Sequence, residues 1–171
     1  MPDWQAEAII LSVRPHGEGS AVISVLTADY GRHAGLVRGG ASSRMRGIMQ
    51  PGNRVRVSWR ARLSEQLGQM QIELIQSVPA LLLDSPLRLS GVASMCALLD
   101  GALPEREAQP GLFEGSAALL DVIVLDVDSA GWVEGYVRWE LGLLAAVGYR
   151  LDLARCIASG QTSDLAFVSP K

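Results

Sequence analysis

Several residue classes are scarce in this sequence, and each shortage excludes a class of protein. Only two cysteines are present, Cys96 and Cys156, and they lie far apart, so neither a disulfide framework nor a cysteine-rich metal site is expected. No apolar run reaches the roughly 20 residues that span a bilayer, because Asp121 and Asp126 interrupt the best candidate. The opening MPDWQAE is acidic and lacks the apolar stretch of a signal peptide, so a cytoplasmic protein is expected.

Acidic residues are absent from one long stretch, and this absence concentrates positive charge. The chain of 171 residues has 15 basic and 18 acidic residues, a net charge of −3. Residues 1–80 contain nine arginines and six acids, a charge of +3, whereas residues 81–171 contain six basic and twelve acidic residues, a charge of −6. Positions 32–64 contain eight arginines and no acid. Such a local excess of positive charge indicates a polyanionic partner.

The segment 53–63, NRVRVSWRARL, alternates strictly between apolar and polar residues, which predicts a β-strand with one buried and one exposed face. We call it the arginine-rich strand. Its exposed face would hold Arg54, Arg56, Arg60 and Arg62. Neighbouring side chains on one face of a strand lie roughly 6.5–7 Å apart, close to the spacing of phosphates along a nucleic-acid strand. This face therefore predicts nucleic-acid contact, although a solvated outer face kept soluble by its charge is the alternative.

The first eighty residues contain five segments with the patterns of strands, separated by turns that contain glycine. These segments are residues 5–14, 20–27, 32–38, 53–63 and 69–77. Residues 39–52 have no sustained period and are expected to form a mobile basic loop. Five short strands with glycine at the bends suit a small closed barrel such as the OB-fold, which also leaves no exposed sheet edges.

Beyond residue 79 the period of the apolar residues lengthens to about 3.5, which predicts helices. They are expected from Asp84 or Ser85 to Leu103, over 112–127, and from Ser129 to Val147. Each helix has a stripe of apolar residues that is expected to face inward. In the first helix the stripe is Leu89, Val92, Cys96, Leu99 and Leu103, and in the second it is Phe113, Leu119, Leu120, Ile123 and Val124. In the third helix it is Tyr136, Val137, Leu141, Leu144 and Val147. After residue 149 the pattern thins to one possible strand, over 165–169.

The sequence therefore predicts an α+β chain in three parts. Residues 1–79 would form the OB-fold barrel and residues 80–148 a helical bundle packed against it. Residues 149–171 are expected to be the start of a further domain that is incomplete in this chain.

Candidate catalytic groups are few. His16 and Glu18 are near neighbours in a glycine-rich turn, but no third group is placed to orient them, so they do not indicate an acid–base pair. His33 lies in the basic stretch and is expected to add to its charge. Trp59 falls on the apolar face of the arginine-rich strand and is expected in the core, whereas Tyr30, at a turn, is the better candidate for stacking on a base.

Three motifs in this chain resemble the bacterial recombination-mediator protein family RecO. They are the HGEGS turn, the pattern T-x-x-Y-G-R-H-x-G-L-V-R-G, and the pattern W-E-L-x-L-L-x-x-x-G-Y. The resemblance extends in the same order over most of the chain, from about residue 7 to residue 171. It implies an N-terminal OB-fold followed by a helical domain.

In function, the resemblance implies a DNA-repair protein that is not an enzyme. Such a protein binds single- and double-stranded DNA, anneals complementary strands, and works with RecR to load RecA onto DNA coated by single-strand-binding protein. Its helical domain binds the acidic C-terminal tail of single-strand-binding protein. The resemblance also implies that the protein is cytoplasmic and associated with the nucleoid. The implied DNA-contacting residues, as a set, are Arg38, Arg44, Arg46, Arg54, Arg56, Arg60 and Arg62.

The sequence departs from the family in two ways. Some relatives hold zinc with four cysteines, whereas this chain keeps only Cys156 in that region, so no metal or other cofactor is expected. The family's chains are also usually longer, so the C-terminal part of the last domain would be missing.

Two other functions remain open at this point. One is a protein-binding adaptor whose basic barrel docks an acidic partner tail, with DNA contact incidental. The other is a nuclease built on an OB-fold, which is disfavoured because the basic half has no carboxylate cluster that could hold a metal ion.

Overall fold

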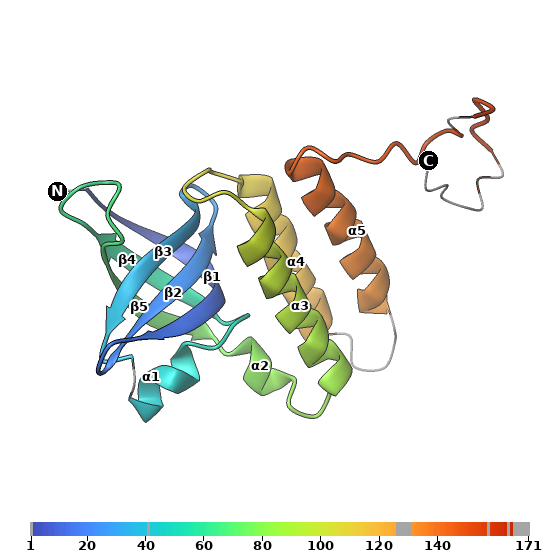
Figure 1. The fold of residues 1–171 in the computed structure, drawn as a ribbon. Coiled ribbons are helices and arrows are strands. Elements are labelled where there is room, and N and C mark those ends of the chain that lie inside the picture. Colours follow the sequence, from blue (N-terminus) through green and yellow to red (C-terminus); the bar gives the residue numbers. More distant parts are fainter. Residues whose placement is uncertain (1, 41, 126–130, 157, 164, 166–171) are drawn as a thin grey trace.

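The structure is a computed structural model that describes residues 2–40, 42–125, 131–156, 158–163 and 165. Its N-terminal part has five strands: β1 (Asp3–His16), β2 (Ser20–Thr27), β3 (Gly31–Arg38), β4 (Arg54–Arg60) and β5 (Gln69–Gln76). They close into a barrel in the order β1-β2-β3-β5-β4, in which the long β1 pairs with both β2 and β4 (Figure 1). This is the architecture of an OB-fold, as the sequence predicted.

The barrel is not closed equally all the way round. Most neighbouring strands pair antiparallel along their length, whereas β3 and β5 are parallel and are paired only at Leu36 and Gln69. The seam between β3 and β5 is therefore the weakest part of the barrel wall.

The basic loop expected over residues 39–52 is not wholly irregular. It contains a short helix, α1 (Ser43–Ile48), whose N-cap Ser42 accepts a hydrogen bond from the backbone N–H of Met45 at 3.3 Å. The expectation of a structureless loop was therefore wrong over these residues, because a serine cap and one turn of backbone bonding suffice for a helix with little apolar periodicity.

The C-terminal part has four helices: α2 (Val78–Leu81), α3 (Pro86–Ala102), α4 (Pro110–Leu125) and α5 (Gly131–Ala146). Helix α2 is a single turn that the sequence did not indicate, whereas α3 begins at Pro86, directly after Ser85, one of the two predicted start residues. The predicted cap Ser129 of the last helix lies outside the described residues. Helices α3 and α4 stand beside the barrel, and α5 lies farthest from it (Figure 1).

Strand β1 joins the two halves because both of its faces are buried at its centre. Ala8 and Ile10 point into the barrel, while Ile9 and Leu11 pack with Leu99 and other residues of the helices. This explains why the sequence has a continuous apolar run here instead of an alternating pattern. The two hydrophobic clusters therefore meet across one strand.

Helix α5 packs through a stripe that overlaps the predicted one only in part: Tyr136 and Val147 pack against the core as predicted. Its buried residues are Trp132, Trp139 and Leu143, whereas Val137 and Leu144 are 49% and 37% exposed. The inward positions predicted for Val137 and Leu144 were therefore wrong, because Trp132 packs against Gly91 of α3 and Trp139 donates a hydrogen bond to Ser116 of α4.

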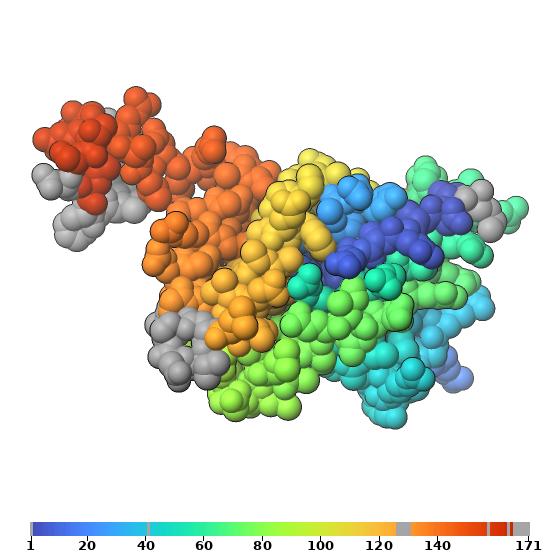
Figure 2. All heavy atoms as spheres, turned by 180° about the vertical axis from the view of Figure 1, so that it is seen from behind, coloured from blue at the N-terminus to red at the C-terminus, as the bar shows by residue number. Residues whose placement is uncertain are grey.

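Beyond α5, the described residues from Leu151 onward form no helix or strand, and they extend away from the helices and the barrel (Figure 2). Except for Leu165, the possible strand over 165–169 lies outside the described residues. None of the helices in the described part of the chain is long and apolar enough to span a membrane.

Candidate nucleic-acid interface

The arginine-rich strand is β4, which ends at Arg60, so the prediction that Arg62 lies on the strand was wrong; within β4 the two faces are those that the alternation predicted. Val55, Val57 and Trp59 are buried in the barrel, and Trp59 donates a hydrogen bond from Nε1 to the backbone oxygen of Leu67 at 2.9 Å. Trp59 is thus a core residue, as expected.

The outward arginines of β4 are not unopposed. Arg54 forms an ion pair with Asp121 of α4 at 3.2 Å, and Arg56 forms one with Glu73 of β5 at 3.6 Å. In the strand register Arg56 also lies opposite Glu7 of β1, so an acid flanks it on both sides. The expectation of a surface of unopposed guanidinium groups was therefore wrong for these two residues, because strand pairing and helix packing place acids from other segments next to them.

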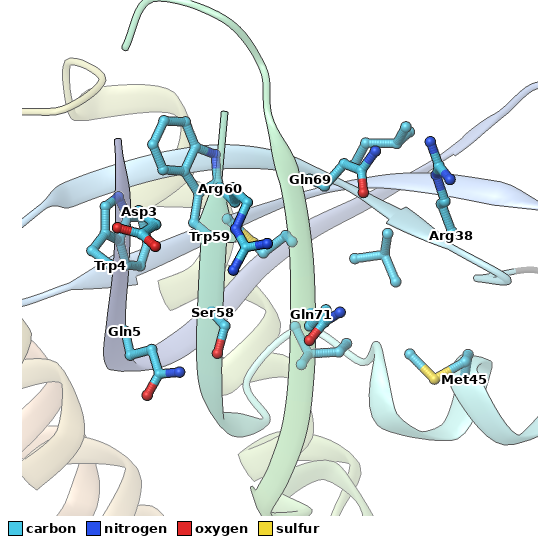
Figure 3. Close-up of a pocket in the computed structure, with 14 residues that line it drawn as sticks. Asp3, Trp4, Gln5, Arg38, Met45, Ser58, Trp59, Arg60, Gln69 and Gln71 are labelled. Atoms are coloured by element: carbon cyan, nitrogen blue, oxygen red, sulfur yellow. The ribbon is translucent and has the colours of Figure 1, made fainter. Parts of the chain in front are cut away.

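Two other arginines, Arg38 and Arg60, line one groove on the barrel surface. A groove of about 640 Å³ lies over the β3–β5 seam, with Arg38 of β3 and Arg60 of β4 on its walls (Figure 3). Its other lining residues come from β1, β3, α1, β4 and β5: Asp3, Trp4, Gln5, Leu36, Val37, Met45, Ser58, Trp59, Gln69, Met70, Gln71 and Ile72. Within the described residues neither arginine of the groove forms an ion pair, although Asp3 faces Arg60 across the strands. The groove therefore has positive side chains available to an anionic ligand.

Most of the groove's polar lining is uncharged. Gln5, Ser58 and Gln71 form one row across β1, β4 and β5, next to a row made by Asp3, Arg60 and Gln69. Figure 3 shows Arg60 between the β1 and β5 side chains, with Arg38 and Met45 toward the other end. Neutral amides beside arginines suit a ligand that has both phosphates and polar uncharged groups.

Three further predicted arginines lie on segments that adjoin this groove. Met45 of α1 lines it, and its neighbours Arg44 and Arg46 are both exposed. Arg62 is exposed in the connection between β4 and β5, residues 61–68, which we call the β4–β5 loop. In the described chain none of these three arginines forms an ion pair, so they can add to the charge near the groove.

The expectation that His33 adds to the basic surface was wrong. His33 is buried at the barrel end, in edge contact with the rings of Trp4 and Trp59 at 5.1 and 4.7 Å. Burial, with a smaller effect from the Arg106 guanidinium, lowers its pKa from 6.5 to about 4. His33 is therefore neutral near pH 7.

Tyr30, the candidate for stacking on a base, already stacks on a residue of the protein. Its ring lies parallel to that of Trp4 with centroids 4.3 Å apart, and Trp4 in turn stacks on Trp59 at 5.7 Å. The three rings form a column at one end of the barrel, so the main role of Tyr30 in the free protein is packing.

The remaining candidate groups show no catalytic arrangement. His16 and Glu18 are both exposed, and no hydrogen bond joins them. Cys96 is buried, and burial raises the pKa of its thiol to about 12. In the described ranges no group of three or more histidines, cysteines or acids is placed to hold a metal ion, and Cys156 is a free thiol.

One residue that contacts the barrel near Trp59 was not predicted from the sequence. Arg106, in the polar connection between α3 and α4, donates from its guanidinium to backbone oxygens of the β4–β5 loop. The segment 104–111 has neither period nor motif, so only the fold could place it against the barrel.

Comparison with known proteins gives two family matches that together span nearly the whole chain. Residues 1–78 match the family model described as Recombination protein O N terminal, and residues 83–171 match Recombination protein O C terminal. The chain belongs to the RecO family. The resemblance read from the motifs is thereby confirmed.

Curated RecO-family relatives match over the full length of this chain and about two thirds of their own. The protein named DNA repair protein RecO from Rhodospirillum centenum is 52% identical over 171 residues, 99% of this chain and 67% of the relative. Proteins of the same name from Jannaschia sp. and Cereibacter sphaeroides are 46% and 49% identical, over 99% and 100% of this chain and 68% and 70% of the relatives.

Proposed function

We propose that this chain acts in DNA repair and recombination by binding single- and double-stranded DNA on the basic side of its barrel and annealing complementary strands. The observation that supports this most is the groove over the β3–β5 seam, in which neither Arg38 nor Arg60 forms an ion pair within the described residues. The shared name of the relatives, DNA repair protein RecO, supports the same role.

The proposed mechanism is electrostatic and requires no catalysis. Guanidinium groups replace counterions on the phosphates, so two strands held on one basic surface repel each other less. Seven arginines are proposed to contribute: Arg38, Arg44, Arg46, Arg54, Arg56, Arg60 and Arg62. In the free protein Arg54 and Arg56 are paired with acids, so DNA must compete with Asp121 and Glu73 for them.

The proposed partners follow from the family. RecR would act together with this chain to load RecA onto DNA coated by single-strand-binding protein, and the acidic tail of that protein would dock on the helical half. A groove of about 590 Å³ between α4 and α5, lined by Leu112, Leu119, Trp139 and Arg138, offers a place for a peptide with apolar side chains, whose acidic groups would compete with Glu134 for Arg138. A pull-down with the tail peptide tests this part of the proposal.

The DNA-binding part is tested with three arginines at or beside the groove. The variant with Arg38, Arg44 and Arg60 changed to alanine should bind a labelled single strand more weakly than the wild type. If each arginine neutralises one phosphate, the slope of log affinity against log salt should fall by about 2. Fluorescence anisotropy between about 50 and 200 mM salt measures both quantities.

The control variant changes three exposed arginines of α5 and the C-terminal tail: Arg138, Arg150 and Arg155. It has the same net charge as the test variant, so an equal loss of binding in both would show that only overall charge matters and would contradict the proposed site. Complementary oligonucleotides, mixed with and without magnesium, separate the functions: annealing supports the proposal, no effect supports an adaptor, and cleavage supports a nuclease.

A further inference from the structure

Arg106 is the one residue other than glycine with a positive φ, 63°, in the described part of the chain. The left-handed region is strained for a residue that has a Cβ atom, and glycine normally occupies it. An arginine kept in this conformation suggests that its side chain does something that glycine could not.

The backbone around Arg106 packs against the start of β3. The N–H of Arg106 donates to the backbone oxygen of Arg32 at 2.7 Å, and Nε of Arg32 donates to the backbone oxygen of Leu103 at 2.8 Å. Gly31 allows this approach, because a Cβ atom at its position would lie 1.8 Å from the backbone oxygen of Glu107. The connection between α3 and α4 is thus fixed to the barrel on both sides of Arg106.

From this position the guanidinium of Arg106 contacts the β4–β5 loop. It donates to the backbone oxygen of Ser64 and, at 2.8 Å, to that of Gln66, and its Cζ lies 6.0 Å from the centre of the Trp59 ring. A planar guanidinium holds its donors in a rigid fork that fits two carbonyl oxygens at a fixed separation, whereas the three donors of an ammonium group rotate on a flexible stem and hold two oxygens less firmly.

Besides the bonds from Arg106, the outer part of the β4–β5 loop has two hydrogen bonds of its own between Leu63 and Gln66, at 3.2 and 3.3 Å. Its first residue, Ala61, is buried in the barrel core, but the side chains of residues 62–67 are all exposed, so no apolar anchor fixes the outer part of the loop. Hydrogen bonds from Trp59 and Leu36 hold only its last residues, Leu67 and Gly68. In the described chain, the hydrogen bonds that residues 62–66 receive from outside the loop come from Arg106 alone.

The loop begins and ends at the groove. It connects Arg60 to Gln69, which are paired across β4 and β5 and both line the groove, and it contains Arg62. OB-folds commonly use this same loop to bind oligonucleotides. The position of the loop therefore bears directly on how a nucleic acid would be held.

We propose that Arg106, a residue of the helical half, is a positioning residue for nucleic-acid binding by the barrel. It holds the β4–β5 loop in one conformation and so places Arg62 and the Arg60 end of the groove before a strand arrives. This inference rests on the proposed function and adds that the barrel's binding surface is completed by the connection between α3 and α4.

The test compares Arg106→Gly and Arg106→Lys with the charge-matched control Arg150→Gly, all in the full chain. Glycine adopts a φ of 63° without strain, so Arg106→Gly should fold and lose only the side chain. Two readouts are used: the rate of trypsin cleavage after Arg62, followed by mass spectrometry without DNA, and the affinity for a labelled single strand.

In Arg106→Gly, cleavage after Arg62 should become about tenfold faster, because proteolysis follows the population of the opened loop. Affinity for the strand should fall about three- to tenfold, the cost of ordering one loop on binding. Arg106→Lys keeps the charge but not the fork and should resemble Arg106→Gly in both readouts, whereas Arg150→Gly should change neither.

Two results would overturn the proposal. If cleavage after Arg62 is unchanged in Arg106→Gly, the side chain does not hold the loop. If Arg106→Lys binds DNA like the wild type, Arg106 acts through its charge alone. Should the wild type itself bind no oligonucleotide, the proposed function fails, while the cleavage rates still decide whether Arg106 fixes the loop.

Discussion

The acids that face β4 should limit its affinity for DNA, and removing them should raise it. The double variant Asp121→Asn and Glu73→Gln removes the acids that form ion pairs with Arg54 and Arg56, and it leaves Glu7 in the register position opposite Arg56. The side chains of the two substituted acids, Asp121 and Glu73, are 51% and 75% exposed, so each ion pair stabilises the fold by about 1 kcal/mol or less, and the variant should remain folded.

The size of the effect follows from counterion release. Each freed arginine that neutralises one phosphate of a single strand adds about 0.7 to the slope of log affinity against log salt, so two add about 1.4. Over a fourfold change, from about 50 to about 200 mM salt, this makes the loss of affinity about sevenfold larger than in the wild type. Fluorescence anisotropy with a labelled oligonucleotide measures the affinity at each salt concentration.

The control for this prediction removes two acids elsewhere. Glu134→Gln with Asp152→Asn also breaks two exposed ion pairs, those with Arg138 and Arg155, and changes the net charge equally. It should leave the salt slope close to that of the wild type. Equal slopes in the two double variants would refute the reasoning, since the gain would then come from overall charge and not from Arg54 and Arg56.

Two further predictions concern stability. Gly31→Ala should lower the free energy of unfolding by more than about 2 kcal/mol, because it combines left-handed strain with a clash against Glu107, whereas Gly17→Ala, in open space, should cost only about 1 kcal/mol; urea titration measures both. His33 has a pKa of about 4 in the folded chain and about 6.5 when unfolded, so its contribution should be complete above pH 6.5 and fall by up to about 3 kcal/mol toward pH 4. Between pH 7 and pH 4.5 the free energy of unfolding should fall less in His33→Phe than in the wild type. An equal fall in both proteins would contradict the lowered pKa of His33.

The sequence predicted the barrel well because its strands have a strong local signal. In β4 every second residue is apolar, and the buried positions Val55 and Val57 follow directly from that period. The helix beginning at Pro86 was equally clear, because proline after a polar residue is typical of a first helical turn.

The same local signals could not predict α5 in detail or the charge environment of β4. Helix α5 is apolar on more than one side, with Val137 exposed and Trp139 buried, so its period does not say which stripe packs inward. The pair between Arg54 and Asp121 joins residues far apart in the chain, and only the packing of α4 beside the barrel brings them together. His33 looked like part of a basic stretch because burial at a barrel end has no local pattern.

The placement of the helices explains why the basic residues do not act as one uniform surface. Ile9 and Leu11 on the outer face of β1 pack against the helices, so that side of the barrel is closed to DNA. Arg54 lies opposite Ile9 in the strand register, at the border with the helical half, and is the arginine that meets a helix acid. Arg60 lies at the other end of β4, in the groove over the β3–β5 seam. Position along one strand therefore sorts its arginines into those held by the protein and those left for a phosphate backbone, so a strand of DNA should first meet the end of β4 that is farther from the helices.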